Sequence, residues 1–148
     1  MLSKLNLPEF DHKLKKAAEK LYIFDLIRKK WIILSPEEWI RQNLSQYLIQ
    51  VKKYSVQRIA HEMTLNIKDY SKRCDIVAFN KELRPYLIIE CKAPEISINQ
   101  KVFDQVFTYN FRLNASYLAV SNGLVHHCLK MNYEEKTYTL LNQFPDPD

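Results

Sequence analysis

The sequence has 148 residues, which is enough to bury one hydrophobic core, and its 47% of hydrophobic residues argues against intrinsic disorder. Lysine and arginine (22 residues) outnumber aspartate and glutamate (17 residues), so the formal charge is +5, which is compatible with a polyanionic partner but does not require one. The single glycine, Gly123, excludes both the phosphate-binding loop and the dinucleotide-binding fingerprint, because each needs at least two glycines.

The three cysteines are scattered along the chain without a C-x-x-C spacing, so the sequence indicates neither a disulfide framework nor a zinc site. No segment approaches the ~18 uninterrupted apolar residues of a membrane-spanning helix, and the N-terminus lacks the apolar stretch of a signal peptide. We therefore expect a soluble, cytoplasmic protein with no membrane contact.

The N-terminal third predicts a hairpin followed by a helix. Short apolar runs at 21–24 and 31–34 surround a polar turn, which indicates a β-hairpin. Ser35 then has the character of an N-cap, with Pro36 in the first turn and Glu38 at the position that closes a capping box. Apolar residues recur at helical spacing as far as about Lys53. On the helical wheel Glu37 falls inside the apolar stripe, so we expect it to face the core.

The rest of the chain predicts strands separated by a second helix. Residues 55–67 suit a strand with one polar face, while 75–79 and 86–91 are nearly continuous apolar runs, typical of central strands covered on both faces. The residues Ser97 to Gln100 have capping-box form, and the helix that follows places Tyr109 on its apolar face. Strands are expected at 117–120, 124–131 and 136–141, and the proline-rich tail 144–148 is expected to be frayed.

This order of elements predicts an α/β sandwich with a mixed sheet flanked by helices. We expect one domain over residues 1–148. Residues 1–34 would form an N-terminal β-hairpin extension, 35–131 the core, and 132–148 a C-terminal strand and tail.

Charged residues meet at the end of the 86–91 strand. Side chains at i and i+2 share a face, so Glu90 and Lys92 project together while Cys91 points to the other face. If this strand forms a hairpin with the preceding one, Asp75 lies beside them. Two carboxylates and the backbone carbonyl of Cys91 can hold a hard cation such as Mg²⁺, and a lysine can orient the attacking water. The spacing alone favours the plainer interpretation, a solvated ion-pair cluster.

Four segments carry a resemblance to a known family. Asp75 with Glu90-Cys91-Lys92 is similar to the signature of the PD-(D/E)xK restriction-endonuclease-like superfamily. More narrowly, the chain from about residue 20 to about 130 resembles the N-terminal nuclease domain of type I restriction enzyme R subunits. The segments that carry this likeness are 35–42, 72–77, 88–94 and 102–110. The resemblance implies a restriction-endonuclease-like core, in the order helix, three strands, helix and strand.

The resemblance also implies roles for these residues. Asp75 and Glu90 would bind Mg²⁺ or Mn²⁺, and Lys92 would serve the attacking water. An acid on the first helix would contribute to metal binding. The family spacing Glu-x-x-(Val/Thr)-Arg fits Glu37 better than Glu38, although both remain candidates. Cys74 stands where the superfamily signature has proline.

Outside the acidic cluster, Gln105 and Tyr109 match the Gln-x-x-x-Tyr motif of this nuclease group, and at i and i+4 they share a helix face. The resemblance implies that Gln105 contacts the active-site lysine or the DNA and that Tyr109 reaches a phosphate or a base. The plainer alternative is that Tyr109 belongs to the core and Gln105 to its polar edge. Lys68, Lys72 and Arg73 flank the proposed site and are expected to meet DNA phosphates.

We therefore expect a metal-dependent DNA endonuclease domain, related to type I restriction enzyme R subunits but without their ATP-driven motor. Its expected partners are DNA and separately encoded restriction or repair proteins. A homodimer is attractive, because one such site cuts one strand. Two alternatives remain: a non-cleaving nucleic-acid-binding or accessory module on a nuclease fold, and a structural domain with an ion-pair network.

Overall fold

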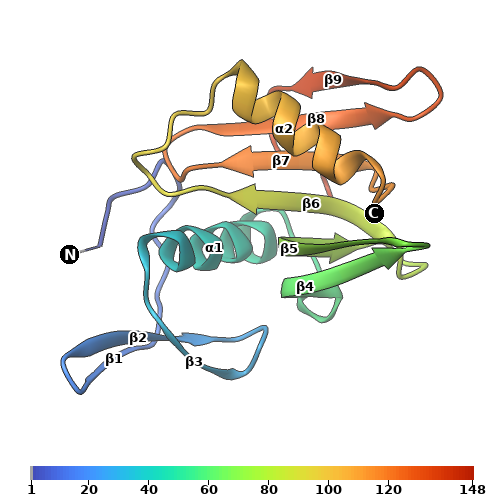
Figure 1. Ribbon diagram of the computed structural model, residues 1–148. Coiled ribbons are helices and arrows are strands. Elements are labelled where there is room, and N and C mark those ends of the chain that lie inside the picture. The colour runs from blue at the N-terminus through green and yellow to red at the C-terminus, as the bar shows by residue number, and fades with distance from the viewer. Residues whose placement is uncertain (1) are drawn as a thin grey trace.

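The computed structural model describes residues 2–148 and contains two β-sheets (Figure 1). A six-stranded sheet has the order β4-β5-β6-β7-β8-β9, and a three-stranded sheet has the order β1-β2-β3. The strands are β1 (Leu14–Ala17), β2 (Lys20–Asp25), β3 (Lys30–Ile33), β4 (Ile59–Ile67), β5 (Tyr70–Phe79), β6 (Pro85–Cys91), β7 (Tyr117–Ser121), β8 (His126–Asn132) and β9 (Thr137–Leu141). The helices are α1 (Pro36–Gln46), continued by a π-helical turn (Tyr47–Val51), a 3₁₀ turn (Val56–Arg58) and α2 (Gln100–Phe111).

The large sheet is mixed, as predicted. Its neighbours pair antiparallel except for β6 and β7, which are parallel and are joined by the crossover through α2. A parallel pair needs such a crossover, whereas short loops suffice for the antiparallel hairpins. In the β5–β6 hairpin, Ile76 lies opposite Ile89 and Val77 opposite Ile88, so the predicted pairing of these two apolar strands is confirmed.

The two helices cover opposite faces of the large sheet. Ile40, Leu44 and Leu48 from the α1 segment join one core cluster with Ile76 and Ile89 of the sheet. A second cluster combines Phe103 and Val106 of α2 with Val77 and Ile88. Neighbouring strand residues thus enter different cores, which explains why β5 and β6 are almost wholly apolar. Fully burying a side chain of this size stabilises the fold by about 1.5–3 kcal/mol.

The predicted hairpin is confirmed as β2 and β3, which pair antiparallel, but the N-terminal segment also contains a third strand that was not predicted. The additional strand β1 pairs antiparallel with β2, in a register that places Ala17 opposite Lys20. Between them, Ala18 and Glu19 both adopt positive φ angles (50° and 62°). This backbone is typical of a tight hairpin turn, but the two turn positions hold Ala18 and Glu19 and not residues that favour it, such as Asn-Gly. The turn was therefore not recognisable in advance.

Two further expectations are corrected. The N-cap of α2 is Asn99, whose side chain accepts a hydrogen bond from the backbone N–H of Val102, and not Ser97. The C-terminal tail is docked rather than frayed, because Phe144 is buried in the α1-side core and the carbonyl of Pro145 accepts a hydrogen bond from the hydroxyl of Tyr54 (2.7 Å). Within residues 2–148, neither helix is long and apolar enough to cross a membrane.

Candidate functional site

The site begins at an irregularity in β5. Along a regular strand, residues two apart share a face. Here Cys74 belongs to the α2-side core and Ile76 to the α1-side core, so the alternation is broken between them, at Asp75. On the neighbouring strand β4, His61 and Met63 are paired with residues of β5, but Glu62 between them is skipped in the pairing and has a positive φ of 50°. The local distortion frees Asp75 from the normal alternation.

The carboxylate of Asp75 is held from two directions. Its Oδ1 accepts a hydrogen bond from Nη2 of Arg41 on α1 (2.9 Å), and its Oδ2 accepts one from the backbone N–H of Cys91 at the end of β6 (2.8 Å). Continuing the β5–β6 register places Asp75 opposite Glu90. The predicted juxtaposition of Asp75 with the end of β6 is therefore present in the fold.

Glu90 projects from the face of β6 opposite to Cys91, whose side chain is buried in the α1-side core. Its carboxylate forms an ion pair with Lys72 of β5. Burial raises the pKa of Glu90 above its usual value, Lys72 opposes this shift, and the charge of nearby Asp75 adds to it. Burial acts to lower the pKa of Lys72, but the hydrogen bond and charge of Glu90 outweigh burial, so that pKa is raised.

Lys92 follows β6 directly, and its backbone N–H donates to the carbonyl of Ser121 on β7 (2.8 Å). Burial raises the pKa of both Glu90 and Glu37, and the positive charge of Lys92 opposes this shift in each of them. The predicted set of Asp75, Glu90 and Lys92 forms one electrostatic cluster, with Glu37 at its border.

The expectation that Glu37 faces the core was wrong. Its side chain is 47% exposed, whereas that of Glu38 is only 5% exposed. The wheel failed because α1 is buried along two stripes: the apolar one that contacts the large sheet, and a polar one that includes Glu38, Arg41 and Gln42. Partial burial and the charge of Asp75 still raise the pKa of Glu37, which places its carboxylate near the cluster.

The carboxylate of Glu38 takes no part in capping α1, although the backbone N–H of Glu38 donates a hydrogen bond to Oγ of Ser35 (3.0 Å). Instead the carboxylate accepts hydrogen bonds from Arg41 (2.6 Å), Gln42 (3.0 Å) and Arg28 (2.9 Å to each oxygen). The second half of the predicted capping box is therefore absent. Glu38 serves as a buried anchor for two arginines.

A buried polar network ties the small sheet to this anchor. Oδ2 of Asp25 contacts Nδ1 of His61 (2.7 Å), and Nε2 of His61 is hydrogen-bonded to the hydroxyl of Ser45 on α1. Asp25 also accepts from Arg28. The order hydroxyl, imidazole, carboxylate is the one used by serine hydrolases. Ser45 is only 1% exposed, however, so no substrate reaches it and the arrangement is structural.

Arg28 and Arg41 connect this network to Asp75, and neither arginine was singled out from the sequence as a site residue. Arg28 contacts Asp25, Glu38 and Glu62, while Arg41 contacts Glu38, Glu62 and Asp75. Burial acts to lower the pKa of Arg41, but the charge of Glu38 and the hydrogen bond to Asp75 outweigh it and raise that pKa. The sequence offered one signal for Arg41, which is the last position of the family spacing Glu-x-x-(Val/Thr)-Arg, and none for Arg28.

Gln105 and Tyr109 lie on the exposed face of α2, and Tyr109 is 51% exposed. The alternative that Tyr109 belongs to the core is thereby excluded. Among residues 2–148, no hydrogen bond joins either side chain to the acidic cluster. Lys68 lies in the β4–β5 turn, and Arg73 on β5 forms an ion pair with Glu62 (2.6 Å).

The candidate metal ligands have the right chemistry but are engaged by protein cations. Asp75, Glu90 and the Cys91 carbonyl offer only oxygen atoms, which suits a hard divalent cation. Burial is the main cause of the raised pKa of Glu90, and the charge of Asp75 adds to it, so a bound cation would stabilise the ionised form of this carboxylate. Arg41 and Lys72 now provide that compensation. Over residues 2–148, no group of three or more His, Cys, Asp or Glu side chains is already arranged to hold a metal ion.

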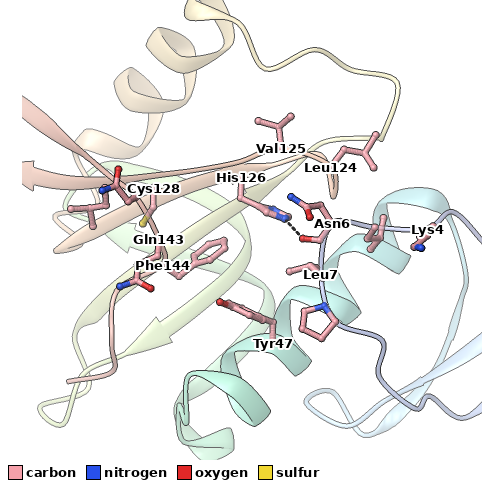
Figure 2. Close-up of a pocket in the computed structure, with 14 residues that line it drawn as sticks. Lys4, Asn6, Leu7, Tyr47, Leu124, Val125, His126, Cys128, Gln143 and Phe144 are labelled. Carbon is pink, nitrogen blue, oxygen red and sulfur yellow. Dashed lines mark hydrogen bonds between the residues drawn. The ribbon is translucent and has the colours of Figure 1, made fainter.

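A cavity of about 830 Å³ lies apart from this cluster, between the N-terminal segment, the β7–β8 connection and the chain end. Figure 2 shows Nε2 of His126 hydrogen-bonded to the carbonyl of Asn6 (2.9 Å), and Tyr47 and Phe144 also line the cavity. None of the predicted site residues lines this cavity. The residues suggested by the sequence therefore lie on β5 and at the end of β6 and not at this pocket.

Comparison with known proteins gives one positive finding. No curated protein matches the chain. The family model described as "Type I restriction enzyme R protein N terminus (HSDR_N)" matches residues 36–145, from the first residue of α1 to beyond the end of β9. This span covers well over half of the chain and includes the entire large sheet and the acidic cluster. The chain therefore belongs to the family of type I restriction enzyme R protein N termini.

Proposed function

We propose that this chain is a metal-dependent DNA endonuclease domain of the PD-(D/E)xK type, with a restriction-endonuclease-like core. The observation that carries the proposal is the position of Asp75, which sits at a break in the alternation of β5, opposite Glu90 and bonded to the backbone of Cys91. Membership of a restriction enzyme family supports hydrolysis of DNA as the reaction.

Mg²⁺ or Mn²⁺ would be held by Asp75, Glu90 and the carbonyl of Cys91, with Glu37 contributing from the border of the cluster. When bound, such an ion neutralises charge on the phosphate and lowers the pKa of its bound water. Arg41 fixes the orientation of the Asp75 carboxylate through its hydrogen bond. Lys72 balances the charge of Glu90, and its ammonium would have to move aside for that carboxylate to bind an ion.

Lys92 would hold and orient the water that attacks the phosphorus atom. Its ammonium donates hydrogen bonds and carries the positive charge that favours hydroxide-like character in a neighbouring water. Hydrolysis adds this water across one P–O bond, and, as the resemblance implies, leaves a 5′-phosphate and a 3′-hydroxyl. Gln105 and Tyr109, exposed on α2, would contact the DNA, and Lys68, Lys72 and Arg73 would contact its phosphates.

The test is nicking of supercoiled plasmid DNA by the purified chain with Mg²⁺ or Mn²⁺. We expect nicking that EDTA stops and that Asp75→Asn and Lys92→Ala each abolish. Asp69→Asn and Lys81→Ala serve as matched controls, because both residues are exposed and lie in turns away from the cluster. Circular dichroism of each variant checks that it folds. Nicking that persists in both Asp75→Asn and Lys92→Ala protein would refute the nuclease assignment.

A second candidate function is favoured by one specific observation: both candidate ligand carboxylates are already paired with protein cations, Arg41 and Lys72. Such compensation suits a non-cleaving module that binds nucleic acid or accompanies separately encoded restriction proteins. Metal-independent DNA binding with no cleavage of any substrate, and unchanged binding by Asp75→Asn protein, would support this second function.

A further inference from the structure

The small sheet has two unlike faces. Ile23 and Asp25 of β2 are fully buried, and Asp25 points toward His61 and α1. Residues directly opposite each other in an antiparallel pair share a face. The other face therefore combines Tyr22 with Ile33 and Phe24 with Trp31, as the β2–β3 register shows. Figure 1 shows the small sheet beneath α1, and the side chains of Trp31 and Ile33 on this second face are exposed.

Lysines from the first strand complete this face. Lys15 lies opposite Tyr22, and the backbone carbonyl of Lys13 accepts a hydrogen bond from the N–H of Phe24. The Nζ of Lys15 is 4.4 Å from the centre of the Trp31 ring and 5.8 Å from that of Tyr22, while the Nζ of Lys13 is 5.7 Å from the Phe24 ring. We name the six residues of this surface the aromatic–lysine face: Lys13, Lys15, Tyr22, Phe24, Trp31 and Ile33.

The face is apolar and exposed, yet it carries positive charge and no acidic side chain. Trp31 is 37% exposed and Ile33 52% exposed. Between residues 13 and 33 the sequence has seven lysines and arginines and two acidic residues, which gives a charge of +5, equal to that of the whole chain. The net positive charge of the protein is thus attributable to this segment. A polyanion is the partner that such a surface complements.

The aromatic rings narrow the choice of polyanion. Nucleobases stack on exposed aromatic side chains, and lysines beside the rings contact the phosphates that connect the bases. Adjacent strands lie about 4.8 Å apart, so three strands offer a platform roughly 10 Å wide, suited to a few unstacked bases. In a duplex the base faces are already stacked on one another. The combination therefore favours a single strand over a double helix.

We propose that the aromatic–lysine face binds single-stranded nucleic acid, with Trp31 as a stacking platform and Lys13 and Lys15 as phosphate contacts. The small sheet is anchored through its opposite side, where Arg28 of the β2–β3 turn donates to Glu38 on the first turn of α1. The binding itself does not depend on cleavage and can be measured in EDTA.

The chain has two tryptophans, Trp31 and Trp39, which allows a direct test. In Trp39→Phe protein all tryptophan emission comes from Trp31, and we expect oligo(dT) to quench it, since a stacked base contacts the ring. Trp31→Phe protein, which emits only from Trp39, is the matched control and should show no change. Oligo(rU) of equal length is tested in parallel. Quenching by either oligonucleotide supports the proposal, and the one that quenches more strongly indicates whether the face prefers DNA or RNA.

Affinity gives a second measurement. By fluorescence anisotropy of a labelled oligo(dT), Trp31→Ala should weaken binding about tenfold, the effect of losing one stacked base. Leu83→Ala, an exposed apolar residue in the β5–β6 loop, should leave it unchanged. Replacing both Lys13 and Lys15 by alanine should reduce the dependence of log K on log salt by about 1.4, at ~0.7 for each phosphate that a lysine no longer neutralises. Lys81→Ala is the single-site control.

Three results would overturn the proposal. One is unchanged Trp31 emission while the oligonucleotide binds, which would locate binding elsewhere. Another is equal affinity for duplex and single strand with no effect of Trp31→Ala. The third is a dimer that dissociates in Trp31→Ala protein without any change in oligonucleotide affinity, which would assign the face to a second copy. Quenching of Trp31 that is retained in Asp75→Asn protein separates this proposal from the nuclease assignment, because the nuclease assignment is tested by nicking and not by quenching.

Discussion

Replacement of Arg41 by methionine tests whether the buried charge network stabilises the fold. The guanidinium is 4% exposed and donates to Glu38 (2.6 Å) and Asp75 (2.9 Å). Removing one partner of a buried ion pair typically costs about 3–5 kcal/mol. Glu38 keeps its two hydrogen bonds from Arg28, and Asp75 keeps the N–H of Cys91. These remaining partners place the expected loss at the lower end, about 3 kcal/mol.

The assay is urea unfolding followed by tryptophan fluorescence, with the free energy of unfolding compared at equal m-values. A loss of about 3 kcal/mol corresponds to a decrease of roughly 6–12 °C in Tm for a chain of this size. Arg112→Met is the matched control, because Arg112 is 61% exposed, lies 3.8 Å from Asp69 and sits over the ring of Tyr70. It should cost less than about 1 kcal/mol. Equal losses for the two variants would refute the reasoning.

Three other changes test separate parts of the structure. Gly123→Ala should destabilise the fold by about 1–3 kcal/mol in the same assay, because φ is +85° and the new Cβ would lie 2.7 Å from Leu5. A loss below about 0.5 kcal/mol, the usual range of surface substitutions, would contradict this expectation. Burial acts to raise the pKa of Asp25, but His61 and Arg28 outweigh it and hold that pKa well below its usual value of 3.8. Asp25 therefore contributes stability above about pH 4 that is lost as the pH falls further, so the stability gap between wild type and Asp25→Asn should shrink in acid; a constant gap would exclude this linkage. Glu37→Gln should reduce nicking without lowering Tm, whereas Glu38→Gln should lower Tm; the reverse pattern would make Glu38 the helix acid.

The sequence was informative where periodicity and counting sufficed. The apolar runs that became β5 and β6 identified two covered strands, and counting through their loop brought Asp75 beside Glu90. A hairpin with a short loop leaves little freedom in register, so the neighbours of a residue follow from its position. The acidic cluster was therefore predictable from strand pairing before any side-chain contact was known.

The remaining features depend on contacts between segments far apart in the chain. The inward turn of Glu38 instead of Glu37 follows from the small sheet, which covers a second side of α1 through Arg28 and Asp25. A helical wheel assumes one buried stripe and cannot show this. The strand β1 was also not predicted, because the turn between β1 and β2 places Ala18 and Glu19 at positive φ, where glycine or asparagine is usual. The pairing of β1 with β2 holds that unfavourable backbone in place.

The distortion at Glu62 has an effect beyond the position of Asp75. The strand β4 forms one edge of the six-stranded sheet and pairs only with β5, so its outer side offers unpaired backbone groups. Such an edge is a template for pairing with another chain and hence for aggregation. The positive φ at Glu62 interrupts the strand near its middle, and its carboxylate is held by Arg73. An incoming strand would meet both a break in the ladder and an ion pair. The same irregularity that accompanies the break in alternation at Asp75 therefore also protects the protein against edge-to-edge association.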